Sequence, residues 1–524
     1  MAKKLPILQI GYTDWSGLYD IPENLDWQYY APENLGELLD DINERKVEKE
    51  AEDEPFYFSF RAILITDRID ELVLEDFSPY VDPYVVFQEG DFELEALSSK
   101  SFFKRKLLRR LPENVQGQPD KILDLFIDNL SPSPLDASRF KNLDMSISPE
   151  FTGEVTYKGF KHTEFVGEFG EDFTLLYDYR YNIGHGAKNI ELWLEYEKEG
   201  DLEIELQVDC LDKGYAGVFK TYRFMEEEMK EPVILNWQEE SNYYSLSLHV
   251  KGSGKLSVGN LYWRKSRNGL GQFLLGGERI SDSHRQELIH YFHPGDMKPP
   301  LNIYFSGYRS AQGFEGYWMM RSMGAPFMLI GDPRLEGGSF YTGSDELETK
   351  LIEVIQKNLD YMGFTHKDFN LSGISMGSYG ALYYASYFEP NAVIVGKPFT
   401  NLGDVARAAT MKRPDEFETI MDVTRTLSTY GGLEEEDLDY INEKFWNKFM
   451  VADFDETKFA VAYMREDDYD GQAFPRLVEN VGPKNVQLFG QGYTGRHNDN
   501  SRAINTWFLN EYHRVLREDF GRDI

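Results

Sequence analysis

The pattern of hydrophobic and polar positions changes twice along the chain, which predicts three domains of different texture. In residues 1 to about 135, short apolar runs predict buried strands at Leu5–Ile10, Tyr57–Thr66 and Tyr84–Phe87, and the charged segment Glu33–Glu54 predicts a solvent-facing helix. Strands that alternate with helices are typical of a small α/β domain. We expect this domain to end at the run Ser131-Pro132-Ser133-Pro134. The sequence leaves its role open, and the docking of partner proteins is one candidate.

Residues 140–285 are rich in alternating β patterns. The expected strands are Phe173–Tyr181, Ile190–Tyr196, Leu202–Val208, Tyr243–Val250 and Lys255–Trp263. Turns are expected between them, at Gly184-His185-Gly186, Lys198–Asp201 and Gly252-Ser253-Gly254. Many short strands predict a β-sandwich. Residues 252–261 resemble the closing strands of jelly-roll carbohydrate-binding modules, so the aromatic side chains of this domain either bind glycans or fill its core.

Residues 290–524 alternate between strand and helix patterns. The expected strands are Leu301–Ser306, Phe327–Ile330, Phe369–Ser372, Ala392–Val395, Phe459–Met464 and Val486–Phe489. Helices are expected over Leu347–Met362, Gly380–Tyr387 and Asn505–Arg517. This order predicts a parallel, α/β-hydrolase-like sheet whose functional site lies at the carboxyl ends of the strands.

The net charge and the cysteine content exclude several classes of protein. The 55 Lys and Arg residues face 90 Asp and Glu residues, so the net charge is 55 − 90 = −35, which opposes nucleic-acid binding. The single cysteine, Cys210, excludes an internal disulfide. The chain shows no signal peptide and no apolar run long enough to span a bilayer, so we expect a cytoplasmic protein. Two interpretations of the basic segment Lys100–Arg110 remain open. It is either a solvated helix, or it binds the inner face of the membrane or an acidic partner.

A candidate nucleophile lies in the third domain, within Gly373-Ile374-Ser375-Met376-Gly377. This G-x-S-x-G pattern follows an expected strand and precedes an expected helix, which is the context of a nucleophile elbow. Small residues are needed on both sides of such a turn because the serine backbone is strained. The turn lifts the Ser375 hydroxyl above the sheet and directs the Met376 N–H toward an oxyanion.

A serine hydroxyl needs a general base, and the base is expected after the nucleophile in the chain. Of the two later histidines, His513 lies inside the last expected helix, whereas His497 lies in a glycine-containing loop after a strand. We therefore predict His497 as the base. The acid is expected after the preceding strand, where Glu466 comes first, and Asp467 and Asp468 are the alternatives.

A second oxyanion donor is expected from the loop after Leu301–Ser306, where the backbone N–H of Tyr308 is the candidate. Two histidines, His290 and His293, flank the start of the third domain, but no set of cysteines or carboxylates stands at ligand spacing. We therefore expect neither a metal nor a bound cofactor.

The whole chain resembles one family. The opening Leu8-Gln9-Ile10-Gly11-Tyr12-Thr13-Asp14-Trp15-Ser16, the β-rich middle, the Gly373–Gly377 motif and the late His497 are similar to the second accessory secretion protein of Gram-positive accessory Sec systems. The resemblance implies a role in exporting serine-rich-repeat glycoprotein adhesins, together with the other accessory secretion proteins and a dedicated motor ATPase. It also implies O-acetylation of N-acetylglucosamine on the adhesin by a Ser–acid–His triad, with Ser375, Glu466 and His497 in these roles and an unidentified acetyl donor.

Two alternatives to this acetyltransferase remain open. The same acyl-enzyme chemistry serves a carbohydrate esterase that transfers the acetyl group to water. A third possibility is a non-catalytic export component whose hydrolase-like domain is only a scaffold. The ordered serine, acid and histidine favour a catalytic site over this scaffold.

Overall fold

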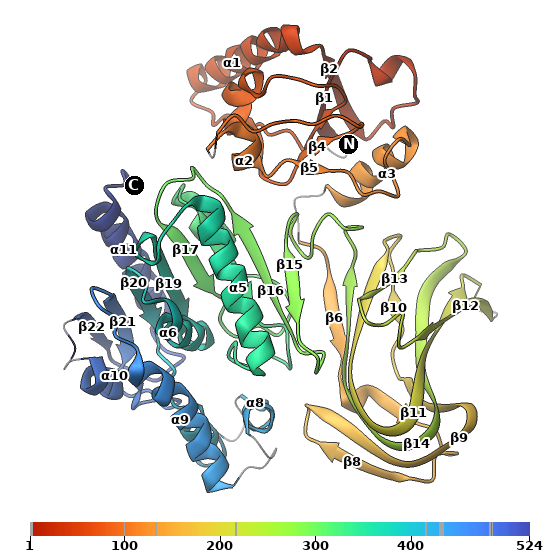
Figure 1. The fold of residues 1–524 in the computed structure, drawn as a ribbon, viewed down its shortest axis with the longest axis vertical. Helices are drawn as coiled ribbons and strands as arrows, with labels where there is room; N and C mark the ends of the chain where they lie inside the picture. The colour runs from red at the N-terminus through yellow and green to blue at the C-terminus, as the bar shows by residue number, and fades with distance from the viewer. Residues whose placement is uncertain are drawn as a thin grey trace. The chain divides into compact units, whose positions relative to one another are not determined.

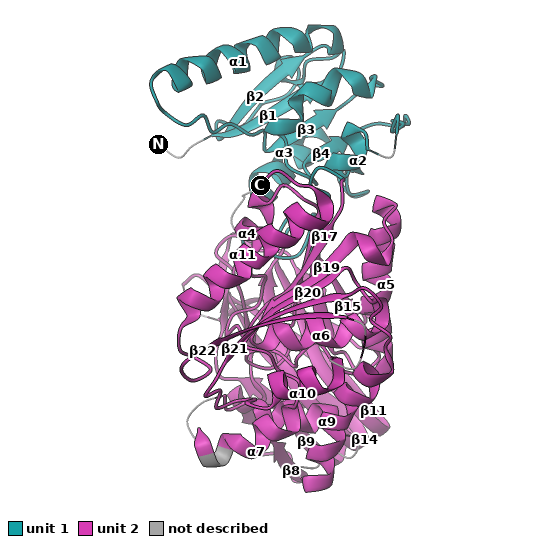
Figure 2. Ribbon diagram, turned by 90° about the vertical axis from the view of Figure 1, so that its left-hand side faces the viewer, with its two compact units in different colours: residues 1–134, 267–277, 293–297 teal, residues 135–266, 278–292, 298–524 magenta. Residues whose placement is uncertain are grey.

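The computed structural model describes residues 4–98, 100–130, 134–214, 217–413, 417–428, 434–481, 484 and 486–524. Of the expected boundary at Ser131–Pro134, residues 131–133 lie outside the described residues. Contacts divide the chain into two compact units: Met1–Pro134 with Arg267–Gly277 and His293–Met297, and Leu135–Ser266 with Glu278–Phe292 and Lys298–Ile524 (Figure 2). Two short segments from the middle of the sequence thus join the first unit, where the sequence predicted contiguous domains.

The first unit is an α/β layer structure around a parallel sheet of order β2-β1-β3-β4-β5. Leu8 on β1 packs in one core with Leu38 of α1, whereas Ile7 packs in a second core with Ile122 of α3. Neighbouring residues of one strand therefore face two helical layers, as a doubly covered sheet requires. The strands are β1 (Leu5–Ile10), β2 (Leu25–Tyr30), β3 (Ala62–Ile65), β4 (Val86–Gln88) and β5 (Arg109–Arg110), and the helices are α1 (Leu35–Ala51), α2 (Phe102–Lys106), α3 (Pro119–Asn129) and the 3-10 helices η1 (Trp15–Gly17), η2 (Pro32–Asn34) and η3 (Glu71–Tyr80).

The basic segment Lys100–Arg110 is tied into this unit. Only the five residues of α2 are helical, with Phe102 and Phe103 buried. The Lys106 ammonium is also buried and donates to the carbonyl oxygens of Ser78 and Val81 at 2.7 Å each. The segment is therefore neither a long amphipathic helix nor a fully solvated one.

The middle of the chain forms one antiparallel sheet whose main path is β12-β11-β14-β9-β7. The three long strands β9, β11 and β14 curve strongly (Figure 1). One hydrophobic core includes residues from both ends of the long strands, among them Leu192 and Val208 of β11. The strands are β6 (Ala137–Phe140), β7 (Met145–Ile147), β8 (Glu154–Lys158), β9 (His162–Tyr179), β10 (Ile183–Gly184), β11 (Ile190–Asp212), β12 (Val218–Met225), β13 (Val233–Leu235) and β14 (Ser241–Lys265), and η4 (Asn142–Asp144) joins β6 to β7.

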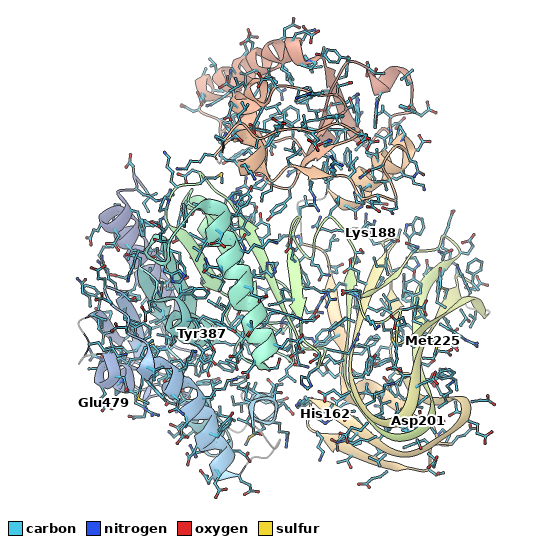
Figure 3. All side chains as sticks on the ribbon, viewed as in Figure 1. His162, Lys188, Asp201, Met225, Tyr387 and Glu479 are labelled. Carbon is cyan, nitrogen blue, oxygen red and sulfur yellow. The ribbon has the colours of Figure 1, made fainter. Side chains whose placement is uncertain are left out.

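Two of the expected turns are instead bends within single strands. The predicted turn at Lys198–Asp201 lies inside β11, and that at Gly252-Ser253-Gly254 lies inside β14 (Asp201 is labelled at the bend in Figure 3). Gly252 has φ 92°, and a Cβ there would lie 2.1 Å from the carbonyl oxygen of Asp201. Glycine at this position lets the paired strands bend together without a break. The expected sandwich of short strands is therefore one sheet of long, bent strands.

Some of the large rings of this sheet fill its core, and others lie on its surface. Tyr177, Tyr244 and Tyr262 are fully buried, as core packing predicts. Others, such as Tyr157 on β8 and Phe219 on β12, are exposed.

The last part of the chain forms an eight-stranded, largely parallel sheet of order β15-β16-β18-β17-β19-β20-β21-β22. The strands are β15 (Glu278–Ser281), β16 (Glu287–His293), β17 (Leu301–Phe305), β18 (Phe327–Gly331), β19 (Phe369–Ile374), β20 (Ala392–Gly396), β21 (Lys458–Met464) and β22 (Gln487–Tyr493). The helices are α4 (Tyr317–Ser322), α5 (Asp345–Met362), η5 (His366–Asp368), α6 (Met376–Phe388), α7 (Leu402–Lys412), α8 (Ile420–Leu427), α9 (Glu435–Val451), α10 (Ala473–Val481) and α11 (Ser501–Phe520).

The parallel arrangement of β17 to β22 is confirmed, and β15 with β16 adds an antiparallel hairpin at one edge. β15 falls before residue 285, so the third sheet begins earlier than the sequence predicted. Among the described residues, no helix combines the length and the apolar character that crossing a membrane requires.

Candidate active site

Ser375 occupies a strained turn between β19 and α6. Its φ of 56° and ψ of −124° place a non-glycine residue at positive φ, which costs free energy unless the surroundings hold it there. Its N–H donates to the carbonyl oxygen of Gly396 at the end of β20, at 2.8 Å. A Cβ at Gly373 would lie 2.2 Å from the carbonyl oxygen of Gly377, and a Cβ at Gly377 would lie 2.1 Å from that of Phe305, so both glycines are required for the turn to close. The predicted elbow is therefore present.

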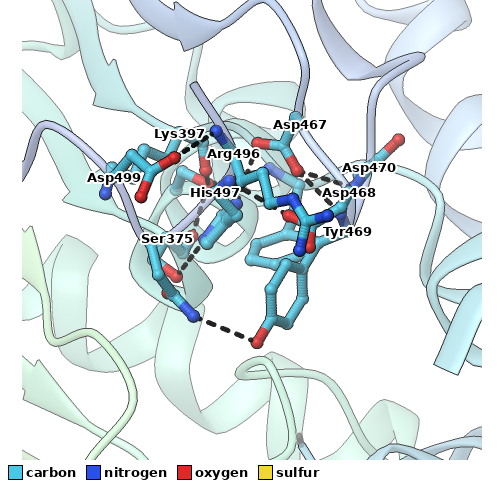
Figure 4. A network of polar contacts seen from close by, with 12 residues as sticks. Ser375, Lys397, Asp467, Asp468, Tyr469, Asp470, Arg496, His497 and Asp499 are labelled. Atoms are coloured by element: carbon cyan, nitrogen blue, oxygen red, sulfur yellow. Dashed lines mark hydrogen bonds and ion pairs between the residues drawn. The ribbon is translucent and has the colours of Figure 1, made fainter. Parts of the chain in front are cut away.

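The imidazole of His497 links this serine to an acid. Nε2 of His497 lies 2.8 Å from Oγ of Ser375, and Nδ1 lies 2.8 Å from Oδ2 of Asp467 (Figure 4). The side chains of His497 and Asp467 are 3% and 4% exposed, so little water competes for either hydrogen bond. Burial raises the pKa of Asp467, but the hydrogen bond and charge of His497, together with the backbone N–H groups of Tyr469 and Asp470, lower it more, so the pKa lies below its ordinary value.

The structure corrects the choice of Glu466 as the partner of His497. Glu466 is exposed and accepts instead from the backbone N–H of Gly495. Asp467 is oriented by its own turn, because its Oδ1 accepts from the backbone N–H of Tyr469 at 2.8 Å and of Asp470 at 3.1 Å. That Asx-type turn directs the second oxygen at the imidazole, whereas the side chain one position earlier points outward.

The other two carboxylates of this loop also have structural partners. Asp468 Oδ1 accepts from the backbone N–H of His497 at 3.1 Å. Asp470 is buried and accepts from the backbone N–H groups of Thr400 and Asn401, at 2.7 Å each. Burial raises the pKa of Asp470 in spite of these donors. The acidic loop is thus fastened to both the histidine loop and the loop after β20.

Aromatic rings and one lysine surround the imidazole, and the sequence pattern did not point to them. The ring of Tyr469 lies 4.5 Å and that of Phe399 4.9 Å from the His497 ring, centroid to centroid. Arg413 stacks 3.3 Å from the Tyr469 centroid and donates from Nε to the Asp468 carbonyl oxygen at 2.9 Å. Lys397 is buried, and burial lowers its pKa even though the negative charge of Asp467 acts in the opposite direction. Only Tyr469 lies in a loop that the sequence predicts to be catalytic, whereas Lys397, Phe399 and Arg413 are distant from both such loops in the sequence.

The two predicted oxyanion donors lie on two different elements. Met376 is the first residue of α6, where a helix N–H has no partner within the helix. The loop after β17 passes over the elbow, since a Cβ at Gly307 would lie 3.3 Å from the Ile374 carbonyl oxygen. The backbone of Tyr308, the next residue, therefore comes close to the elbow. Its role as the second donor stays a prediction.

Nothing in the described part of the chain gathers three or more His, Cys, Asp or Glu side chains in a geometry for a metal ion. Burial lowers the pKa of His290 to about 4, so this side chain is neutral at pH 7. The Nδ1 atom of His293 accepts from the N–H of Gly295 at 3.0 Å.

Comparison with known proteins identifies the family. The sequence profile described as the accessory Sec system GspB-transporter matches residues 5–522. The chain belongs to this accessory Sec family. It is 37% identical over 534 positions to the accessory Sec system protein of this family from Streptococcus gordonii, and all of both chains is covered. It is 36% identical to the corresponding accessory Sec system protein of Staphylococcus aureus (strain NCTC 8325 / PS 47), with 100% of this chain and 98% of that protein covered.

A solved relative has the same fold. A chain of the Glycosylation Associate Protein (Gap123) complex from Streptococcus agalactiae superposes with a TM-score of 0.92 at 36% identity, and each chain is fully covered. The resemblance to the second accessory secretion protein that the sequence motifs indicated is therefore confirmed over the full length.

Proposed function

We propose that this chain is an export component of the accessory Sec system that also O-acetylates N-acetylglucosamine residues of its serine-rich-repeat glycoprotein cargo. The observation that carries the enzymatic half is the Asp467–His497–Ser375 relay, with 2.8 Å between each pair of hydrogen-bonded atoms. A serine with an ordinary role needs neither a strained backbone nor a buried histidine aimed at its hydroxyl.

In the first half-reaction, Ser375 Oγ attacks the carbonyl carbon of an acetyl ester or thioester while His497 Nε2 takes the hydroxyl proton. The Met376 N–H and the backbone N–H of Tyr308 stabilise the negative oxygen of the tetrahedral intermediate. When the bond to the leaving group breaks, the imidazolium returns its proton to that group. Asp467 keeps the imidazole in the required tautomer and stabilises its charged form.

In the second half-reaction, a sugar hydroxyl attacks the acetyl-serine carbonyl and gives its proton to His497 Nε2. The bond between that carbonyl carbon and Ser375 Oγ then breaks, and His497 returns the proton to the serine. Water in place of the sugar hydroxyl gives hydrolysis, which is the esterase alternative. Transfer prevails over hydrolysis when a bound acceptor displaces water from the acyl-enzyme.

The export half of the proposal is supported by the family and by the solved relative. That relative is a chain of the Gap123 complex, and two curated relatives are named as accessory Sec system proteins. We infer that this chain likewise assembles with the other accessory secretion proteins and the motor ATPase at the cytoplasmic side. The unit that contains Met1–Pro134 is a candidate docking surface.

The test separates the two roles. Wild type and Ser375→Ala are expressed in a deletion strain, and both secretion of the glycoprotein and acetylation of its glycans are measured by mass spectrometry. We expect Ser375→Ala to abolish acetylation and to leave secretion intact. Unchanged acetylation in Ser375→Ala would contradict the enzymatic role, and intact secretion in the deletion strain itself would contradict the export role.

A further inference from the structure

The loop that carries the predicted second oxyanion donor is closed by a carboxylate. Residues 306–316 join β17 to α4, and Tyr308 lies near the start of this loop. Near its end, Oε2 of Glu315 accepts from the backbone N–H of Gly307 at 2.8 Å. The N–H of Glu315 in turn donates to Oγ of Ser306 at 3.1 Å. Two hydrogen bonds therefore join the ends of the loop at the residues that directly precede Tyr308.

Ser306, where this closure begins, is itself fixed beside the nucleophile. The residue is 1% exposed, and its N–H donates to the Ile330 carbonyl oxygen at 2.9 Å. Its own carbonyl oxygen accepts from the Tyr341 hydroxyl. A Cβ at Gly377 would lie 3.0 Å from that carbonyl oxygen, so Ser306 lies against the elbow. The direction of the following peptide groups is thus set from a fixed point.

The next residue, Gly307, is where the chain could still turn. A glycine backbone has more freedom than that of any other residue, and rotation at Gly307 would redirect the N–H of Tyr308. The N–H of Gly307 is bound by Glu315, whereas that of Tyr308 has no acceptor within the described part of the chain. A hydrogen bond to a carboxylate is stronger than one between neutral groups. Glu315 therefore restricts the rotation and leaves the following N–H available.

The Tyr308 side chain fixes the other side of the same peptide group only in part. A Cβ at Gly337 would lie 2.0 Å from the Tyr308 ring, so the ring packs directly on this glycine. The ring also meets that of Phe417 edge to face, with 6.1 Å between centroids. Tyr308 is nevertheless 48% exposed. Its backbone position therefore depends on the clasp before it as well as on these ring contacts.

The charge of Glu315 is offset at the carboxylate itself. A negative group close to a developing oxyanion would oppose the reaction. Nη1 of Arg309 lies 3.7 Å from Oε1 of Glu315, on the oxygen that Gly307 does not use, and both side chains are 34% exposed. The contribution of Glu315 is therefore its acceptor oxygen and not its charge.

We propose that Glu315 is a positioning residue, which fixes Gly307 and thereby directs the N–H of Tyr308 at the negative oxygen of the tetrahedral intermediate. This inference rests on the proposed function, in which that N–H is the second oxyanion donor. The negative charge on this oxygen develops only on the way to the intermediate. A misdirected N–H therefore lowers kcat and leaves KM nearly unchanged.

The experiment measures hydrolysis of p-nitrophenyl acetate by the full chain, which requires no sugar. We expect Glu315→Ala to lower kcat by about 10- to 100-fold, with KM within about threefold of wild type. Glu315→Met, which keeps most of the bulk but has no oxygen, should show the same loss. Glu315→Gln keeps an acceptor oxygen and should stay within about threefold of wild type. The pH at which kcat/KM is half-maximal should be the same in all four chains, because His497 is unaltered.

Glu346→Ala is the matched control. Glu346 of α5 is also partly exposed, accepts from the backbone N–H of Ser283 at 2.9 Å and pairs with Lys350 at 2.7 Å, so its removal should leave kcat unchanged. Thermal unfolding of each variant shows whether it is folded. An unchanged kcat in folded Glu315→Ala and Glu315→Met, an equal loss in Glu315→Gln, or a shifted pH profile would overturn the positioning role.

The failure of the proposed function gives a different result. A folded wild-type chain that neither hydrolyses the ester nor reacts with a fluorophosphonate at Ser375 would overturn the catalytic role and this inference with it. A wild-type chain that does both, beside a Glu315→Ala chain with the same kcat, would overturn the positioning role alone.

Discussion

Nδ1 of His497 lies 2.8 Å from Oδ2 of Asp467, and both side chains are buried. The residue before this aspartate, Glu466, points away to the Gly495 backbone. Two adjacent carboxylates in the loop therefore have different partners, and only one of them contacts the base. Substituting each of them separately tests the site.

The first prediction compares two amide substitutions in that loop. Asp467→Asn keeps the shape of the side chain but removes its negative charge and favours the wrong imidazole tautomer, so labelling of Ser375 by a fluorophosphonate should slow by about 10³–10⁴-fold. Glu466→Gln should change the rate less than about threefold, since an exposed amide oxygen still accepts from Gly495. The rates are measured by intact-mass spectrometry. The opposite order would restore Glu466 as the acid.

A second prediction concerns pH and the stability of the antiparallel sheet. Burial raises the pKa of Glu195 to about 7, although Asn260 and Tyr262 donate hydrogen bonds to its carboxyl group. The folded chain therefore holds a proton that the unfolded chain releases near pH 4.5, so this group's contribution to stability is lost as pH rises through 7. Glu195→Gln cannot ionise. Relative to this variant, wild type should lose about 2 kcal/mol between pH 5.5 and 8.

Thermal unfolding at the two pH values measures this difference. The Tm of Glu195→Gln minus that of wild type should increase from pH 5.5 to pH 8. A constant difference would mean that the Glu195 carboxyl ionises equally in the folded and unfolded chains.

The third prediction tests the close packing of the elbow. A Cβ at Gly377 would lie 2.1 Å from the Phe305 carbonyl oxygen, so Gly377→Ala should destabilise the fold by about 1–3 kcal/mol and abolish labelling of Ser375. Gly36→Ala is the control, because nothing lies within 4 Å of that position in α1. Alanine there should stabilise the helix by about 0.5–1 kcal/mol. Full labelling in a folded Gly377→Ala chain would refute this packing.

The fourth prediction tests the buried ion pair of the loop after β18. Asp332→Asn leaves the Arg334 charge buried without its partner, so it should lower the free energy of unfolding by about 3–5 kcal/mol. The exposed pair of Lys46 and Glu50 gives the comparison, and Lys46→Ala should cost less than about 1 kcal/mol. Both are measured by denaturant unfolding, and equal effects would show that burial does not strengthen the first pair.

The hydrophobic pattern alone predicts β1 of the first unit and the strands that surround the nucleophile. The range predicted for the first strand, Leu5–Ile10, is the range observed for β1, and the last four predicted strands match β19 to β22 within a few residues. β19, β20 and β21 are buried on both faces, so their apolar runs are continuous and bounded by polar residues, whereas β22 is a largely exposed edge strand. The order of Ser375 and His497 was likewise available, because a nucleophile elbow and a late loop histidine are local features.

Two features depend on contacts that no local pattern contains. The sequence pattern predicts a turn at Gly252, yet Gly252 pairs with Leu202 of β11 and lies at a bend within β14, where a Cβ would meet the Asp201 carbonyl oxygen. Among adjacent acidic residues, Asp467 is distinguished from Glu466 by a turn of its own loop and by the position of a second loop. Both are set by tertiary pairing.

The measurement that tests the central claim most directly is intact-mass labelling of the full chain with a fluorophosphonate, for wild type, Ser375→Ala and His497→Ala. An activated serine predicts one adduct on wild type, none on Ser375→Ala, and a strong slowing in His497→Ala. A folded wild-type chain that stays unlabelled, or a Ser375→Ala chain that labels equally, would contradict the account of this site as a catalytic centre.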